Sequence, residues 1–451
     1  MRGIFRCAIT AGIMIPAGLG QSLFDQASFR SMSVGGVRLY GVSVYAGYAT
    51  SAYPGAYTQA APLYTGLGPD VNYGASTSAG WQHHGQHTDL GLTYSLNFGG
   101  LVQNSESNAF NHSLSFSMSH VLTPKWTLTL SANGNYSTIL QYLYQPSNVA
   151  LISQVPATMD DLAAAFSLGQ FSSNQVASML TGAPVLDSPA RTLLVGSRIL
   201  TYSGQASLTY AHSSRLNFHL SAVTAAGQNR IGGNDQVPEH NYAMPRSIGL
   251  NAGMGLSYML SPRTQLGADV EGSHTSNQYQ GAYTTNASVS IGRKMSQRWF
   301  VTGHVGASIT HMTLQLYGTP QTKQVAFGGS LGYRTYQHSF VATYERSGAD
   351  PFGFAIGTNS TIMGGWSWHR PGARWSVFAN IDQQRVSNTG YVALTGWVAS
   401  GGIGEALSSN VQVSLQYVYS SNSGTYLGSA TNLSAQSIRL TASWTPAPVI
   451  R

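Results

Sequence analysis

The sequence predicts an all-β fold, a transmembrane antiparallel β-barrel of about 18 strands. Three observations predict it. Apolar and polar residues alternate with period two along most of the chain, which is typical of strands with two different faces. Short turns of similar chemistry recur between the strands. Only 8% of the 451 residues are charged, about a third of the share that soluble domains carry.

The alternation is clearest between residues 88 and 98. The even positions from Leu90 to Phe98 are leucine or aromatic, whereas the odd positions from Asp89 to Asn97 are polar or glycine. The final strand shows the same pattern, with apolar residues at the even positions from Ile438 to Trp444. These segments therefore each present one apolar face and one polar face.

The same rule predicts 18 strands, an even number that places both chain ends on one side of a closed barrel. Sixteen is the alternative, because the patterns at 37–49 and 338–346 are weak. The predicted strands are 37–49, 70–82, 88–98, 112–122, 126–137, 199–211, 215–225, 246–260, 264–273, 279–293, 299–310, 324–334, 338–346, 360–369, 374–385, 391–405, 410–420 and 435–445.

Connections between the strands alternate in length. The short ones are turns built from Ser, Pro, Gly and a basic residue, and the others run to about 60 residues. The basic turn residues either bind lipid head groups or are solvated turn residues, and both interpretations stay open. They are Lys125, Arg215, Arg263, Arg298 and Arg374.

The polar face decides which side of the barrel is inside. It consists of Ser, Thr, Asn, Gln and Gly, whereas a soluble barrel would expose Lys, Glu and Arg. A ring of 18 strands is also too wide for side chains to fill its centre. We therefore expect the apolar face to contact lipid and the polar face to line a wet lumen.

Aromatic residues gather near the predicted strand ends, as expected for the two girdles of a membrane barrel. A soluble β-propeller, the alternative with a similar repeat, has no reason to place them there. The expected girdle at the tight-turn ends comprises Trp81, Trp126, Trp299, Trp375 and Trp444, with Tyr258 and Tyr333. At the loop ends we expect Tyr48, Tyr73, Phe98, Tyr136, Tyr202, Tyr279, Tyr344, Trp366 and Tyr391.

The N-terminus resembles a secretory signal, with two arginines, an apolar run and small residues before Gln21. We expect a signal peptide over 1–20, a periplasmic N-terminal extension over 21–36 and a tail over 446–451. No later segment is apolar enough for a spanning helix. The 11% aromatic content and the net charge of only +7 argue against intrinsic disorder.

With this hairpin repeat and these girdles, residues 37–445 resemble the porin-like outer-membrane β-barrels of Gram-negative bacteria. The resemblance is architectural and points to no substrate-specific family. Trp444 matches the aromatic residue that ends such barrels, but TPAPVIR follows it, which departs from the pattern. The resemblance implies short periplasmic turns, long extracellular loops and an outer-membrane location.

The segment 138–198 is the third and longest outer loop, where porins fold a loop into the lumen. Capping-box spacings and apolar stripes predict two short helices in it. We expect a plug or eyelet, with an extracellular cap as the alternative. The constriction candidates are Asp160, Asp161 and Phe166. Because no arginine ladder faces them, strong charge selectivity is not expected.

Strand parity places a few ionisable residues on the lumen wall, where charges tune ion selectivity. The remaining lining is hydroxyl and amide, which favours neutral polar solutes. The pore-lining candidates are Asp89, His219, Asp269, Glu271, His304, Asp382 and Arg439.

The chemistry of an enzyme is not favoured. Asp269 and Glu271 share a face, but glycoside hydrolysis needs a carboxylic acid shifted by burial. Ser330 in GGSLG lies mid-strand and not at a strand-to-helix elbow. The histidines near residue 84 lack the companions of a metal site. We therefore expect no catalytic residues, no metal and no cofactor.

Two functions remain open from the sequence. The first is a channel for passive diffusion of small polar solutes across the outer membrane. The second is a non-conducting surface barrel that acts as an adhesin or scaffold through its long loops. The expected partners are outer-membrane lipid, lipopolysaccharide and small polar solutes, with a homotrimer as a further option. Nucleic acid is not expected, because there is no Lys/Arg-rich stripe.

Overall fold

A computed structural model describes the architecture. The residues it describes are 32–34, 36–50, 69–103, 108–138, 198–230, 247–277, 280–314, 321–347, 357–369, 373–388, 392–426 and 429–446. In this part of the chain, every regular element is a β-strand. No helix among these residues is long and apolar enough to cross a membrane.

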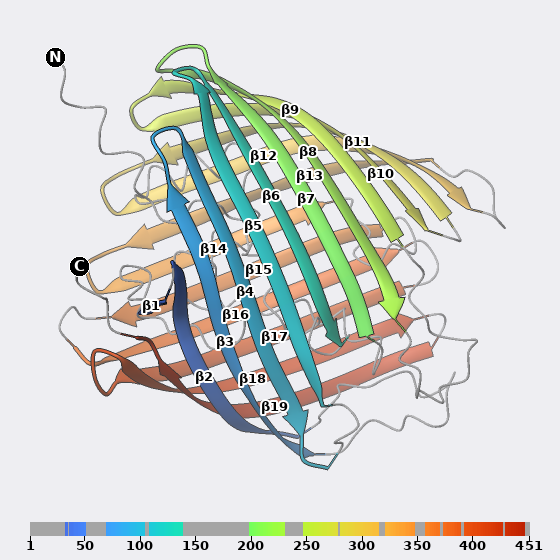
Figure 1. The fold of residues 1–451 in the computed structure, drawn as a ribbon. Helices are drawn as coiled ribbons and strands as arrows, with labels where there is room; N and C mark the ends of the chain where they lie inside the picture. Colours follow the sequence, from blue (N-terminus) through green and yellow to red (C-terminus); the bar gives the residue numbers. More distant parts are fainter. Residues whose placement is uncertain are drawn as a thin grey trace.

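The strands follow one another along the chain in simple up-and-down order (Figure 1). They are β1 (Met32–Val34), β2 (Val37–Ala49), β3 (Asp70–His84), β4 (Thr88–Leu101), β5 (Ala109–Thr123), β6 (Trp126–Thr138), β7 (Arg198–Ala211), β8 (Leu216–Arg230), β9 (Ser247–Ser261), β10 (Thr264–Asn277), β11 (Gln280–Lys294), β12 (Trp299–Leu314), β13 (Gln321–Arg334), β14 (His338–Ser347), β15 (Gly357–His369), β16 (Trp375–Asn388), β17 (Val392–Ala406), β18 (Val411–Tyr426) and β19 (Ser429–Trp444).

The sheet closes into a barrel of 18 strands, β2 to β19. Each of these strands pairs antiparallel with the next, and β19 pairs with β2 from Ser437 opposite Ala49 to Trp444 opposite Val42. The two weak patterns, at 37–49 and 338–346, are the strands β2 and β14, so the count is 18 and not 16. Closure pairs the backbone groups of the first and last strands, as a membrane barrel requires.

A short hairpin precedes the barrel. β1 pairs antiparallel with the start of β2, from Met32 opposite Leu39 to Val34 opposite Val37. Gly36 lies in the turn with a φ of +85°, a conformation that is unfavourable for residues with a Cβ. The hairpin falls in the stretch expected as an N-terminal extension, whereas the signal peptide expected over 1–20 lies outside the described residues.

Five of the tight turns share one hydrogen-bond arrangement. In the turn after β11, the hydroxyl of Ser296 accepts hydrogen bonds from the backbone N–H groups of Arg298 and Trp299, both at 3.1 Å. Such Ser/Thr turns satisfy the backbone where the ladder ends. Equivalent hydroxyls act at Thr123, Ser213, Thr335 and Ser408. These turns therefore share a Ser or Thr, followed two residues later by a basic or polar residue, whose hydroxyl stabilises the reversal of chain direction.

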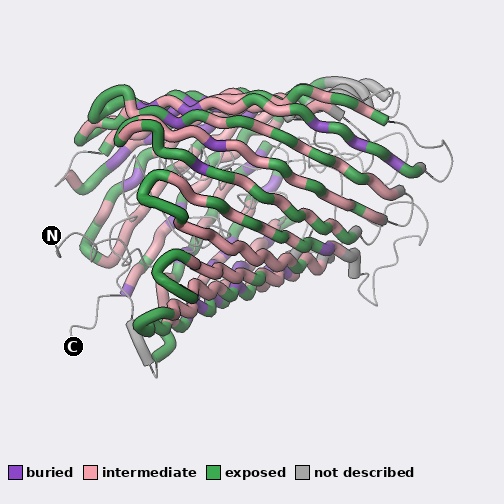
Figure 2. The backbone as a smooth tube through the Cα atoms, turned by 90° about the horizontal axis from the view of Figure 1, so that it is seen from above, coloured by how far each residue is buried: buried purple, intermediate pink, exposed green. Residues whose placement is uncertain are grey.

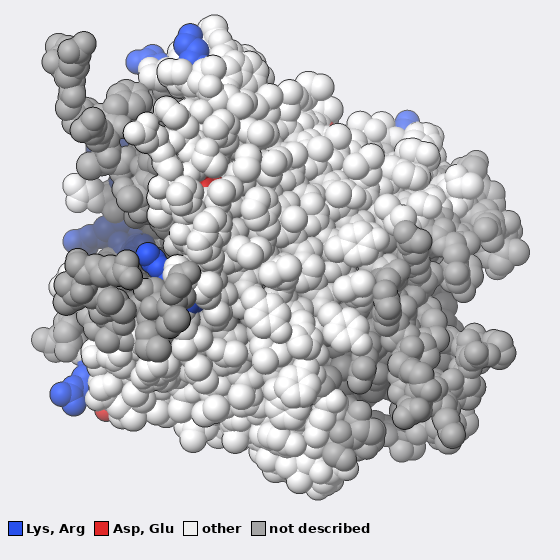
Figure 3. Space-filling model, viewed as in Figure 1, with Lys and Arg blue, Asp and Glu red and all other residues white. Residues whose placement is uncertain are grey.

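The two faces of the strands differ in exposure, which alternates along each strand (Figure 2). Outward apolar residues are well exposed: Leu250 is 55% exposed and Met254 is 61% exposed. Inward residues are covered, for example Ser257 of the same strand and Thr302 of β12. Figure 3 shows a wall almost without charge, with Lys and Arg gathered towards the end that carries the tight turns. An apolar outer wall of this kind matches a lipid environment.

Among the described residues, the predicted aromatic positions lie near the expected strand ends with one exception, whereas Tyr279 and Tyr391 lie outside the described residues. Trp366 was expected at a loop end, but β15 runs towards the tight-turn side and ends three residues later at His369. The Trp366 indole N–H donates a hydrogen bond to Nδ1 of His338, at 3.3 Å, beside the turn that precedes β14. This prediction was wrong because the direction of the strand was not applied to that residue.

Several strands extend further towards the loops than the sequence predicts. β18 continues to Tyr426 and β8 to Arg230, past the predicted ends at 420 and 225. The sequence of the added part of β18, from Ser421 to Thr425, has no alternation of apolar and polar residues. Backbone pairing continues there although the alternation has ended, because the hydrogen-bond ladder does not depend on side-chain polarity.

Candidate functional site: the barrel lumen

All seven pore-lining candidates lie on the inward face. Six of them are next in sequence to an exposed, outward apolar residue, as Val270 lies between Asp269 and Glu271. The same holds for His219, His304, Asp382 and Arg439, beside Leu220, Val305, Ile381 and Leu440 respectively. Asp89 lies on the face of β4 opposite to the exposed residues Leu92 and Tyr94. Parity in the sequence therefore places these residues on the lumen wall in the structure.

Two of the candidates, a histidine and a carboxylate, lie within contact distance across a glycine. His219 on β8 and Asp269 on β10 both lie opposite Gly255 of the intervening strand β9. His219 Nε2 is 3.2 Å from Asp269 Oδ1, and about a fifth of each side chain is exposed. A Cβ at Gly255 would overlap both side chains. The glycine thus leaves the space in which residues two strands apart meet.

The same arrangement occurs a second time. His304 on β12 and Glu345 on β14 lie opposite Gly328 of β13. His304 Nε2 is 3.5 Å from Glu345 Oε1, and a Cβ at Gly328 would lie 2.7 Å from the His304 ring. Each histidine–glycine–carboxylate triplet depends on the register of three strands, so the pattern of one strand alone does not predict it.

Glu345 is a lumen residue that the sequence analysis missed. The signal was present, because Phe340, Ala342 and Tyr344 alternate outward and leave the odd positions of β14 facing inward. The strand has only 10 residues, and its alternation was too brief for Glu345 to be assigned to the inward face.

The adjacent carboxylates of β10 are held by different partners. Asp269 faces His219, whereas Glu271 accepts a hydrogen bond from Nδ2 of Asn251 on β9. The two groups thus have separate contacts with the wall, and no shared partner brings them together. This arrangement resembles lumen charges more than a paired-carboxylate catalytic site.

The remaining candidates have distinct surroundings. The Arg439 guanidinium lies 4.6 Å from the ring centroid of Tyr45, within cation–π range. Asp382 lies opposite Met363 and Val398 of the neighbouring strands, both buried. Asp89 Oδ1 is 3.0 Å from His84 Nδ1 at the tight-turn end of β4.

The rest of the described wall is largely uncharged. On β4 to β6 the inward positions carry the amides Asn97, Asn111 and Asn135, all buried. Inward hydroxyls are spread around the barrel, for example at Ser43, Ser76, Thr93, Ser115, Thr302, Ser308, Thr343 and Ser400. Ser330 of the GGSLG stretch is one more of these, mid-strand on β13. Groups of this kind hydrogen-bond with water and neutral polar solutes.

Two large inward side chains lie over glycines of the neighbouring strands. The sequence analysis did not predict this arrangement. Phe300 is fully buried opposite Gly332, and Phe378 lies opposite Gly402. A Cβ at either glycine would overlap the facing ring. These aromatic residues make one sector of the wall, on β12 and β16, more apolar than a purely polar lining.

On the described inward face, acidic residues predominate in the middle of the barrel and basic residues at the tight-turn ends. Away from the strand ends, the described inward face carries three carboxylates, Asp269, Glu271 and Glu345, and one guanidinium, Arg439. Asp382 also lies there, between apolar neighbours. Other inward-face Lys and Arg positions stand at the tight-turn ends: Arg38, Lys294 and Arg334. The net charge of +7 is therefore no guide to the charge in mid-lumen.

The constriction candidates Asp160, Asp161 and Phe166 lie outside the described residues, as does most of loop 138–198. Across the strands that are described, no group of three or more His, Cys, Asp or Glu is arranged to hold a metal ion.

The expected tight-turn girdle stands on the outer wall. Four tryptophans there are between 37% and 47% exposed: Trp81, Trp299, Trp375 and Trp444. Trp126 packs against Tyr210 of β7, with ring centroids 4.6 Å apart. Broad, half-exposed indoles at one level of the wall are typical of a membrane interface.

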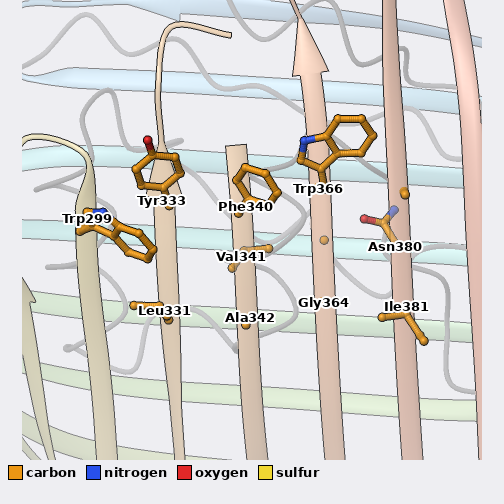
Figure 4. Close-up of a pocket in the computed structure, with 12 residues that line it drawn as sticks. Trp299, Leu331, Tyr333, Phe340, Val341, Ala342, Gly364, Trp366, Asn380 and Ile381 are labelled. Atoms are coloured by element: carbon orange, nitrogen blue, oxygen red, sulfur yellow. The ribbon is translucent and has the colours of Figure 1, made fainter. Parts of the chain in front are cut away.

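The outer wall also carries an apolar groove beside this girdle (Figure 4). Across four strands, Leu331, Ala342, Gly364 and Ile381 stand in one row, so two small residues lie between two large ones. Trp299 borders the groove, whose volume is about 700 Å³. Because the groove opens outward and its lining is apolar, it belongs to the lipid-facing wall and not to the lumen.

Similarity to known proteins is found among solved structures. No protein-family model and no curated protein matches the chain. Among solved structures, OccK9 (OpdG) of Pseudomonas aeruginosa is 12% identical with a TM-score of 0.46, covering 90% of this chain and 97% of that one. OccK2 (OpdF) of the same organism, in complex with glucuronate, is 7% identical with a TM-score of 0.47, covering 91% and 98%. The FrpB iron transporter of Neisseria meningitidis is 10% identical with a TM-score of 0.42, covering 90% and 82%.

Similarity at this level concerns the barrel alone and identifies no solute. The strand count, the closure between β19 and β2 and the two faces give this chain the architecture of a porin-like outer-membrane β-barrel.

Proposed function

We propose that this protein is an outer-membrane channel for passive diffusion of small polar solutes. One observation carries the proposal: a closed ring of 18 strands has an exposed apolar outer wall and an inward face of hydroxyls and amides. A ring of this size leaves an interior that its own wall side chains do not fill. Water and small solutes then meet hydrogen-bonding groups along the wall.

Single-channel recording tests the proposal. The chain from residue 21 onward is refolded into lipid, and folding is checked by its β-rich circular dichroism and resistance to protease. Discrete, steady conductance steps are expected. Silence from folded protein contradicts the channel and favours the alternative, a surface barrel whose long loops bind a partner.

The role proposed for the third outer loop needs its own variant. Deleting residues 156–181 removes the candidate constriction and leaves the described strands intact. If the loop narrows the lumen, the deletion raises conductance and speeds the swelling of vesicles in neutral sugars of increasing size. Unchanged conductance and an unchanged size limit contradict the constriction.

A further inference from the structure

The ionisable residues of the mid-lumen wall are not balanced in charge. Asp269 is the sixth residue of β10, Glu271 the eighth, and Glu345 the eighth of β14. On the described inward face at this height, Arg439 is the basic counterpart, and its guanidinium lies against the face of Tyr45. The carboxylates are therefore more numerous than the guanidinium in this part of the lumen.

The three carboxylates are presented to the lumen and are not hidden in the wall. Asp269 and Glu345 keep side-chain exposures of 21% and 32% even within their histidine pairs. Their neighbours across the sheet are Gly255 and Gly328, which have no side chain to cover them.

Asp382 does not belong to this group. It stands between Met363 and Val398, and its Oδ1 has no hydrogen-bond partner. A charge without a partner beside apolar side chains is costly. The acidic character of the mid-lumen wall therefore depends on the other three carboxylates.

Among the described basic residues, Arg439 alone offsets these charges at the same height. The others at inward-face positions stand at strand ends, and those of the tight turns lie beyond the strands. Exposed charges are screened over about 8 Å at physiological ionic strength. Among the described wall residues, an ion at mid-height thus experiences mainly Asp269, Glu271 and Glu345, offset in part by Arg439.

We propose that Asp269, Glu271 and Glu345 make the channel prefer cations, so that small cationic solutes pass more readily than anionic ones. This inference rests on the proposed channel function and specifies its charge class. A unit charge about 10 Å from a permeating ion in water contributes roughly a two-fold effect on its population. Before screening by salt, a net charge of about −2 at mid-height then raises the population of a monovalent cation about four-fold and lowers that of an anion by about the same factor.

The experiment is the reversal potential in a ten-fold KCl gradient at pH 8. The triple variant Asp269→Asn, Glu271→Gln, Glu345→Gln keeps the shapes of the side chains. The matched control is Glu405→Gln, which removes an exposed carboxylate from the outward face at the tight-turn end of β17. Conductance and protease resistance confirm that each variant is folded and open.

A potential of the cation-selective sign, lost in the triple variant and kept in the control, supports the inference. Conductance without cation preference, or an equal preference in the triple variant, overturns it and leaves the channel function standing. Absence of conductance from folded protein overturns both. The outcomes therefore separate the charge class from the channel itself.

Discussion

Replacing Gly332 with alanine is expected to destabilise the barrel by displacing Phe300. The inward Cβ of the new alanine would overlap three ring atoms of Phe300, which is fully buried. The ring has to leave its place, and full burial of a phenylalanine contributes about 1.5–3 kcal/mol. Alanine recovers about 0.5–1 kcal/mol, because glycine loses more conformational freedom on folding. The expected net loss is about 2 kcal/mol in the free energy of unfolding.

The assay is urea unfolding of the barrel in lipid vesicles, followed by tryptophan fluorescence. Gly134→Ala is the matched control, because a Cβ at Gly134 meets nothing within 4 Å. It is expected to change the free energy by less than about 1 kcal/mol. A second comparison introduces Gly332→Ala into the Phe300→Ala variant, where Gly332→Ala is expected no longer to lower the free energy of unfolding. An equal loss with and without the Phe300 ring would refute the steric reasoning.

Two further predictions concern the lumen wall. Gly255→Ala is expected to separate His219 from Asp269. The coupling energy measured by a double-mutant cycle between these two residues then falls from about 0.2–1 kcal/mol, the usual value for partly exposed pairs, to near zero. An unchanged coupling energy contradicts the role given to the glycine. Asp382→Asn is expected to leave the reversal potential unchanged and to raise the free energy of unfolding by about 1 kcal/mol, because it removes a carboxylate from apolar surroundings; a shift of the reversal potential towards anions contradicts this placement.

The glycines show how a barrel of this width places large side chains on its inner wall. In a sheet, neighbouring inward residues stand side by side, and a large residue beside another large one crowds it. Phe300 and His304 each lie opposite a glycine, as do their counterparts Phe378 and His219. Glycine abundance in the chain is therefore connected with the shape of the lumen as well as with turns.

Much of the site could be predicted from strand parity. The alternation assigned Asp269, Glu271 and His304 to the inward face, because successive side chains of a strand point to opposite sides. Glu345 was missed on the short strand β14, where the pattern is brief. Trp366 was assigned to the wrong end of the barrel, since its exposure to lipid follows from parity but its height depends on strand direction.

The sequence by itself determined the all-β class, the count of about 18 strands, the girdles and the faces. These follow from local rules, since period two, turn chemistry and low charge act within a few residues. Only the tertiary structure decided which residues meet across strands. The pairs His219–Asp269 and His304–Glu345 join strands that are not neighbours, and each needs a glycine between them. Register fixes these contacts, because sliding one strand by a single residue turns every side chain to the other face.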